Sequence, residues 1–267
     1  MAIIGAILGD IAGSQFEFDR IDIKKTETCD LFSDDCMFTD DTVMTLAVKY
    51  AIDNNLGYRE AMQHVGIRYP GCGYGGRFYE WIVKQHPNPY NSWGNGSAMR
   101  ASYIGEHFEN LEDVIAEAEK SAIVSHNHPE GIKGAVTTAV CIWMAKHGKS
   151  KDEIRKYALA QYPDGQYKYT VNSDWADMEK NYQWDVSCQG SVPVAIKCFL
   201  ETDSYEAFLR RVIRLECDSD TICCIGGGIA EEFYGTTGLD NEILLKMYLD
   251  EYLYCIFETG KEPANLK

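Results

Sequence analysis

Two short clusters of carboxylates and hydroxyls lie far apart in the chain. They are Thr39-Asp40-Asp41 and Asp218-Ser219-Asp220-Thr221, and each leads into an apolar segment. Adjacent carboxylates repel each other unless protons, cations or strong hydrogen-bond donors compensate their charge. Apart from Arg214, no Lys or Arg lies within four residues of either cluster. Because the ligand atoms on offer are oxygens, the four carboxylates predict a site for two Mg²⁺ or Mn²⁺ ions.

The first cluster also has a purely structural interpretation. Thr and Asp are favoured at helix N-termini, where they cap backbone N–H groups and interact well with the helix dipole. For the second cluster an EF-hand is excluded, because Cys223 occupies the position at which a calcium loop needs glycine. A second pair of acids elsewhere in the chain favours the metal interpretation over a cap alone.

Three other segments could contact a ligand. The glycines of Ser92-Trp93-Gly94-Asn95-Gly96 would let backbone N–H groups approach an anion, although a plain turn explains them too. His126 begins a His-Asn-His loop that lacks a third metal ligand, so we expect it to hydrogen-bond a ligand. Glu17 stands between two phenylalanines and is either a surface acid or a functional group. Aromatic side chains that could stack on a base are Tyr74, Trp93 and Trp184.

The elements that must position these residues are helices. Apolar residues recur with helical spacing, and strand-like alternation is scarce. We expect helices over residues 43–50, 111–122, 131–148, 205–214 and 242–257. Glycine-, proline- and asparagine-rich connections separate them, and no flexible linker divides the chain. The sequence therefore predicts one compact all-α domain of residues 1–267, an orthogonal multi-helix fold whose loops hold the site.

Composition excludes several classes of function. The chain has 41 Asp and Glu against 25 Lys and Arg, and its net charge of −16 disfavours binding to a nucleic-acid backbone. The ten cysteines are scattered, and the start of the chain lacks a cationic segment of the secretory type. We expect reduced thiols and a cytoplasmic protein. No apolar run approaches the roughly 18 to 20 residues that span a bilayer, so no membrane partner is expected.

Taken together, the motifs resemble the ADP-ribosylglycohydrolase family, of the dinitrogenase-reductase-activating glycohydrolase and ADP-ribosylhydrolase type. The resemblance runs from Gly5-Ala6-Ile7-Leu8-Gly9-Asp10 to Tyr234-Gly235. It implies an all-α domain with a binuclear Mg²⁺ or Mn²⁺ site at the base of an ADP-ribose cleft. The residues that match the family's metal ligands are Thr39, Asp40, Asp41, Asp218, Asp220 and Thr221.

The resemblance also assigns the remaining site residues. Glu17 matches an acid near the metals that takes part in catalysis or in gating, and Asp41 and Asp218 join it as candidate catalytic groups. His126 matches a histidine that contacts the ligand. The loop Ser92, Gly94, Asn95 and Gly96 matches the diphosphate loop, with Trp93 next to the adenosine.

Some segments depart from the family pattern. Glu216-Cys217 replaces two glycines and adds a charge that could alter metal affinity. Ser102-Tyr103 stands where many members have a small residue and proline, and Glu231-Glu232 replaces a Gly-Ala pair. Residues 185–193 resemble a compact bacterial branch, so substrate assignments from other branches transfer poorly.

The implied reaction is cleavage of the glycosidic bond at C1 of the distal ribose, which releases ADP-ribose from a modified protein or small molecule. A nucleic acid would be a target only as a modified end. Two alternatives stay open. One is a two-metal phosphohydrolase acting on a nucleotide, because paired carboxylates and an anion loop suit phosphoryl transfer too. The other is a non-catalytic, ADP-ribose-binding or crystallin-like relative.

Overall fold

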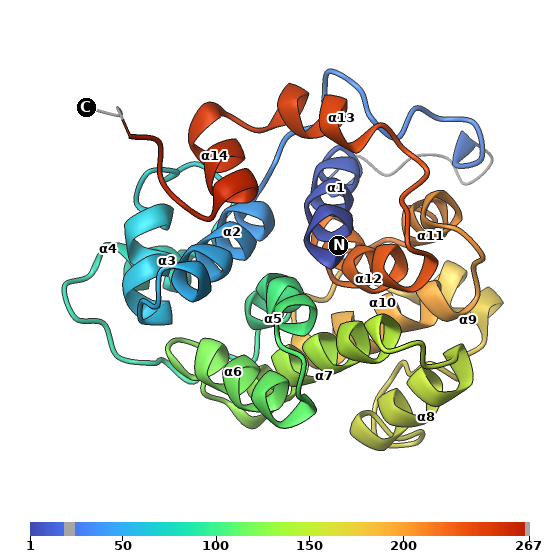
Figure 1. Ribbon diagram of the computed structural model, residues 1–267. Coiled ribbons are helices and arrows are strands. Elements are labelled where there is room, and N and C mark those ends of the chain that lie inside the picture. Colours follow the sequence, from blue (N-terminus) through green and yellow to red (C-terminus); the bar gives the residue numbers. More distant parts are fainter. Residues whose placement is uncertain (19–24, 265–267) are drawn as a thin grey trace.

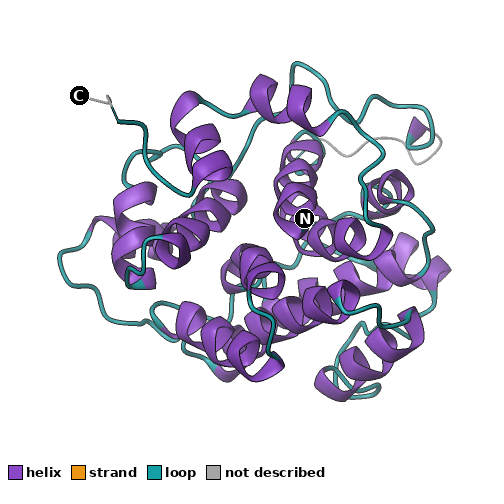
Figure 2. Ribbon diagram, viewed as in Figure 1, coloured by secondary structure: helices purple, strands orange, loops and turns teal. Residues whose placement is uncertain are grey.

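The computed structural model describes residues 1–18 and 25–264, and the fold is all-α, as predicted (Figures 1 and 2). No strand occurs among the described residues. Two short 3₁₀ helices, η2 (Asn95–Ser97) and η3 (Met99–Ala101), lie between α4 and α5. The α-helices are α1 (Ala2–Ser14), α2 (Asp40–Asp53), α3 (Tyr58–Gly66), α4 (Gly76–Val83), α5 (Ser102–His107), α6 (Leu111–Ile123), α7 (Pro129–Lys146), α8 (Lys151–Gln161), α9 (Trp175–Asn181), α10 (Cys188–Leu200), α11 (Tyr205–Val212), α12 (Ser219–Tyr234), α13 (Asn241–Tyr248) and α14 (Glu251–Thr259).

The predicted helix over residues 242–257 is wrong in one respect, because the structure breaks it into α13 and α14. Leu249 and Asp250 between them are extended, with ψ angles of 140° and 170°. The Asp250 side chain accepts a hydrogen bond from Leu253 N at 2.9 Å and thereby caps α14. Buried apolar residues continue on both sides of the break, so apolar spacing alone did not reveal it.

Helices α1 and α12 lie side by side at the centre of the molecule (Figure 1). Three glycines of α1, each four residues from the next, touch the backbone of α12. A Cβ atom built on Gly5, Gly9 or Gly13 would lie 2.3, 2.2 or 2.4 Å from the carbonyl oxygens of Gly227, Cys223 and Ser219, respectively. The reversed order of these contacts shows that the helices are antiparallel. Only glycine permits such an approach, and the approach brings the end of α1 to the start of α12.

Distant carboxylates cap the start of α1. Ala2 N donates to Glu232 Oε2 at 2.8 Å, and Ile3 N donates to Glu106 Oε2 at 2.9 Å. Negative groups are favourable at this end of a helix because they pair with its free N–H groups and its dipole. Glu232, one of the departures from the family pattern, therefore has a structural role: it ties the end of α12 to the start of α1.

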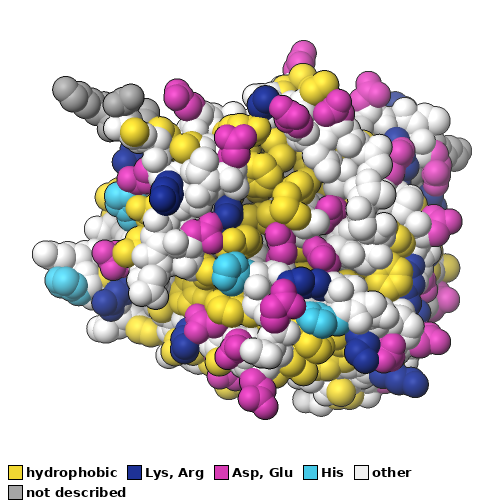
Figure 3. Space-filling model, in the orientation of Figure 1, with side chains coloured by type: hydrophobic (Ala, Val, Ile, Leu, Met, Phe, Trp, Pro, Cys, Tyr) yellow, Lys and Arg dark blue, Asp and Glu magenta, His cyan; other side chains and the backbone are white. Residues whose placement is uncertain are grey.

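The surface carries charged side chains of both signs (Figure 3), and the cysteines are present as thiols. Figure 3 shows acidic and basic side chains interspersed over one face of the molecule. All ten cysteines are free thiols, and seven of them are buried. Among the described residues no helix combines the length and the apolar character needed to cross a membrane.

The glycine contact makes a testable prediction. Gly9→Ala should lower the free energy of unfolding by about 1–3 kcal/mol, because the added methyl group has only rigid backbone to displace. Gly71→Ala is the control, since a Cβ at Gly71 meets nothing within 4 Å, and it should change stability by less than about 0.5 kcal/mol. Urea denaturation of both variants measures the difference. Equal stabilities would show that α1 and α12 are not in backbone contact.

Candidate metal centre and ligand cavity

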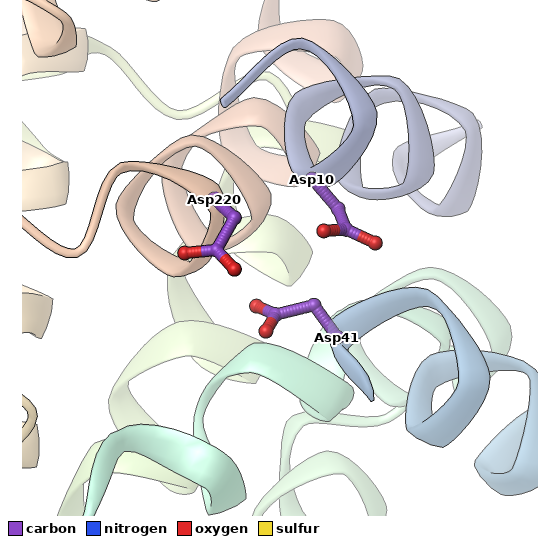
Figure 4. Close-up of side chains that lie close together, drawn as sticks. All are labelled: Asp10, Asp41 and Asp220. Carbon is purple, nitrogen blue, oxygen red and sulfur yellow. The ribbon is translucent and has the colours of Figure 1, made fainter. Parts of the chain in front are cut away.

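Three buried carboxylates from three helices converge on one point. Asp10 of α1, Asp41 of α2 and Asp220 of α12 point toward one another (Figure 4), and one oxygen from each lies within 4.8 Å of the others. Asp41 and Asp220 were predicted to share a site. Asp10 was not, although a lone carboxylate in the apolar run of residues 5–13 was a usable signal, since isolated charges are seldom buried without a partner.

Asp10 fixes the start of α2. Its Oδ1 accepts from Thr39 Oγ1 at 2.6 Å, and its Oδ2 accepts from Thr39 N at 2.9 Å and Thr42 N at 3.0 Å. The Thr42 hydroxyl donates to the same Oδ2. Four donors therefore surround one buried carboxylate. Asp10, which belongs to α1, thus accepts hydrogen bonds from the first turn of α2 and holds the Thr39-Asp40-Asp41 segment in place.

The first acid cluster is both a helix cap and part of the carboxylate group. Thr39 caps α2 by accepting from Asp41 N at 3.3 Å. Asp41 Oδ2 accepts from Thr221 Oγ1 at 3.1 Å, which joins the two predicted clusters directly. Asp41 Oδ1 is buried and has no hydrogen-bond partner among the described residues. An orphaned buried carboxylate oxygen costs free energy, and a cation would satisfy it.

A second group of carboxylates shares Asp220. Oxygens of Glu17, Asp218 and Asp220 also lie within 4.8 Å of one another. Asn95 Nδ2 donates to Asp218 Oδ2 at 2.6 Å and to Ser191 Oγ at 2.9 Å. The glycine-rich loop is thus tied to the carboxylates through Asn95. Glu17, which the sequence left undecided between a surface acid and a functional group, lies at the site.

Burial and mutual repulsion dominate the electrostatics. Burial, with repulsion from Asp220 and Asp10, raises the pKa values of Asp40 and Asp41 well above their usual range. Burial raises the pKa of Asp218 to about 6, against the opposing effect of its hydrogen bond from Asn95. Burial, with repulsion from Asp220 and Asp10, raises the pKa of Glu17 to about 8.

This repulsion is not relieved by any cationic side chain that the structure describes. Within residues 1–18 and 25–264, none of these carboxylates forms an ion pair with a Lys, Arg or His. The available donor atoms are carboxylate and hydroxyl oxygens, which suit hard divalent cations. The residues present therefore fit a metal centre, and the orphaned Asp41 oxygen points to the same conclusion.

A cavity of about 540 Å³ opens beside the carboxylates, which is in the usual range for a small-molecule site. Phe78, Tyr90 and His126 form part of its lining, as do glycines of the loop before α4. Phe18 and Trp184 also line it, with ring centroids 5.0 Å apart. The predicted site residues that line it are Glu17, Thr39, Asp40, Asp41, Ser92, Gly94, Asn95, Gly96, His126, Asp218, Asp220 and Thr221.

Trp93 is the one predicted site residue that the structure does not bring into the cavity. Its side chain is 48% exposed, and its ring packs edge-on against His128 with centroids 5.6 Å apart. Its carbonyl oxygen is held by Cys188 N at 2.8 Å. Of the three aromatic residues considered for base stacking, Trp184 alone lines the cavity, and Tyr74 does not.

The departure at Glu216-Cys217 lies beside the site in sequence but not in its lining. The Glu216 side chain is exposed, and Cys217 is buried in the core. Neither residue contributes to the cavity wall.

The chain is similar to a known family of proteins. The family model described as ADP-ribosylglycohydrolase matches residues 1–258. The chain is similar to ADP-ribosylhydrolase ARH3 of Homo sapiens, with 26% identity over 87% of this chain and 84% of the human protein. It is also similar to ADP-ribosylhydrolase ARH3 of Danio rerio, with 23% identity over 99% of this chain and 92% of the relative.

A solved structure titled "ADP-ribosylglycohydrolase-related protein complex" has a similar fold. Its TM-score is 0.71, with 19% sequence identity over 93% of this chain and 90% of that chain. At this identity the likeness concerns the fold alone, and the family assignment rests on the match to residues 1–258. The chain belongs to the ADP-ribosylglycohydrolase family.

Proposed function

We propose that this protein hydrolyses the glycosidic bond at C1 of the distal ribose in an ADP-ribosylated target and releases ADP-ribose. One observation carries the proposal: a single cavity is lined both by the uncompensated carboxylates and by the Ser92–Gly96 loop. This arrangement offers a cation site for ribose hydroxyls next to a glycine-rich loop for an anion. Family membership supports the same activity. In this proposal residues 1–267 act as one domain.

The proposed cofactors are two Mg²⁺ or Mn²⁺ ions. Asp40, Asp41, Asp218 and Asp220 would hold them, with the hydroxyls of Thr39 and Thr221 as further ligands. Such ions, when bound, would orient ribose hydroxyls and lower the pKa of a nearby water. Asp10 is assigned a different role, because its oxygens already accept four hydrogen bonds from the start of α2. It would position the ligands.

The proposed acid–base chemistry centres on Glu17. In the metal-free protein its pKa is about 8, so its carboxyl group holds a proton near neutral pH. Bound cations would lower this pKa, and a carboxyl group that can both hold and release a proton suits acid–base catalysis. Asp41 and Asp218 are the other catalytic candidates, because they face the same cavity. Enzymes that break glycosidic bonds usually use two carboxyl groups. One donates a proton to the leaving group, and the other stabilises the positive charge that develops on the sugar.

The proposed targets are ADP-ribosylated proteins or small molecules. The curated relatives are named ADP-ribosylhydrolases. Product analysis tests the proposal: the protein is incubated with Mg²⁺ or Mn²⁺ and peptides ADP-ribosylated on arginine or on serine. Free ADP-ribose supports it. AMP or inorganic phosphate would instead identify a phosphohydrolase, and binding without turnover of any such substrate would identify a non-catalytic relative.

Neutralising a proposed ligand separates metal binding from folding. Asp41→Asn and Asp218→Asn should abolish both the release of ADP-ribose and the stabilisation by metal, which is about 2.7 kcal/mol when the ion is at 100 times its Kd. Without metal, both variants should be at least as stable as the wild type, because the amide replaces a carboxyl group whose ionisation is opposed by burial and repulsion. Thermal unfolding with and without Mn²⁺ measures this.

Asp152→Asn is the matched control for Asp41→Asn. Both aspartates are the second residue of a helix, but Asp152 is exposed on α8. The control should keep the metal-dependent shift and the activity. Normal turnover and a normal shift in both Asp41→Asn and Asp218→Asn would refute the proposed metal centre.

The raised pKa values predict how pH affects the metal-free protein. Groups whose pKa is higher in the folded state stabilise it at low pH, and this contribution is lost as pH rises through the folded pKa. The values of about 6 for Asp218 and about 8 for Glu17 place the loss between roughly pH 4 and pH 8. In EDTA the melting temperature should therefore fall from pH 5 to pH 8.

Saturating Mn²⁺ should remove this fall, because deprotonated carboxylates bind the ion more tightly. Glu17→Gln should flatten the part of the metal-free profile between about pH 6 and about pH 8, where the contribution of Asp218 has already been lost. A metal-free melting temperature that stays level or rises from pH 5 to pH 8 would contradict the charge distribution described here.

A further inference from the structure

His126 lies at the cavity, with one ring nitrogen toward the glycine-rich loop. The residue is only 4% exposed, yet it contributes to the cavity lining. A Cβ atom built on Gly96 would lie 3.2 Å from His126 Nε2, so this nitrogen faces the Ser92–Gly96 loop. Nε2 has no hydrogen-bond partner among the described residues, whereas Nδ1 lies 2.8 Å from Ser125 Oγ. Whether Nε2 carries a proton decides what the cavity can bind there.

Arg100 determines the direction of the hydrogen bond between Ser125 and His126. The Arg100 side chain is completely buried, and its Nη2 donates to Ser125 Oγ at 3.0 Å and to the Ser121 carbonyl at 2.7 Å. A guanidinium group only donates, so Ser125 Oγ is the acceptor in that contact and keeps its own proton free to donate. Within the described parts of the chain, His126 Nδ1 is the one acceptor in hydrogen-bonding reach of that proton.

If Nδ1 carried the proton, Ser125 Oγ would accept from both Arg100 and His126, and its own buried hydroxyl proton would have no acceptor among the described residues, which is costly. The ring therefore carries its single proton on the other nitrogen. If Ser125 donates to Nδ1, then Nδ1 is unprotonated, and a neutral imidazole has its N–H at Nε2. The ring is neutral because burial and the positive charge of Arg100 hold the pKa of His126 well below its usual range. The aromatic rings of Phe78 and Tyr90 flank it, with centroids 5.9 and 5.8 Å away, and bring no carboxylate to it.

We infer that Arg100 and Ser125 fix His126 as the Nε2-protonated tautomer, which presents one N–H donor to an acceptor atom of the ADP-ribose moiety. The inference rests on the proposed function for the identity of the ligand, but the tautomer follows from the hydrogen bonds alone. His126 would contact the ligand, whereas Arg100 and Ser125 are positioning residues. The carboxylates would then supply the cation side of the cavity, and His126 a neutral donor beside the glycine-rich loop.

The tautomer can be observed directly. Nitrogen-15 NMR of ring-labelled histidine at pH 7 distinguishes a protonated from an unprotonated ring nitrogen, and the His126→Gln spectrum identifies which of the six histidines is His126. We expect an unprotonated Nδ1 and a protonated Nε2. Ser125→Ala should populate the Nδ1-protonated form, because Nδ1 loses its donor. Ser125→Thr keeps the hydroxyl and should restore the wild-type pattern.

Calorimetric titration with ADP-ribose tests the role of the donor. His126→Gln retains an amide N–H near the position of Nε2 and should bind within about threefold of the wild type, whereas His126→Phe should bind roughly tenfold or more weakly. Ser125→Ala should weaken binding roughly three- to tenfold. Ser121→Ala is the matched control: it removes a buried hydroxyl near Arg100 but leaves the Ser125–His126 bond intact, so it should change neither affinity nor spectrum.

The outcomes separate this inference from the proposed function. A wild-type ring that is protonated at Nδ1, or at both nitrogens, overturns the inference whatever the protein binds. Unchanged affinity in folded His126→Phe and Ser125→Ala overturns the role of the donor. A wild-type protein that does not bind ADP-ribose at all overturns the proposed function and the ligand assignment with it, while the spectrum still decides the tautomer.

Discussion

Repulsion among buried carboxylates is the constraint on which the rest of this structure depends. Asp10, Asp41 and Asp220 bring their charges together inside the protein, and no Lys or Arg among the described residues pairs with them. Such a group is costly to assemble, because burial and like charge both oppose ionisation. The surrounding fold therefore has to be rigid enough to hold the carboxylates together. Their charge also has to be compensated, by protons or, as we propose, by divalent cations.

Two features supply that rigidity. The glycine contacts between α1 and α12 set the distance between Asp10 and Asp220, since backbone cannot yield as a flexible side chain does. The four hydrogen bonds to Asp10 then fix the first turn of α2, which carries Asp41. The carboxylates are thus held at the ends of packed helices, whereas loops form much of the remaining wall of the ligand cavity. Its lining combines the carboxylates with the neutral His126 ring.

Much of the fold and part of the site could be predicted from sequence, because their signals are local. Helical spacing of apolar residues predicted the all-α fold, and adjacent acids marked Asp40-Asp41 and Asp218 to Asp220 as partners for cations. Where a prediction depended on residues that are distant in sequence, it was less complete. Asp10 was not recognised as part of the carboxylate group, and the break between α13 and α14 was missed because apolar residues continue through it.

By itself, the sequence determined which chemical groups are present and the helices that carry them, because helix formation and charge repulsion between neighbours act over a few residues. Only the tertiary structure decided which groups share the cavity. It placed Glu17 there and kept Trp93 outside. It also connected Arg100 to His126 through Ser125. The physical reason is that hydrogen bonds and charge interactions depend on distances in space, which only the packed helices fix.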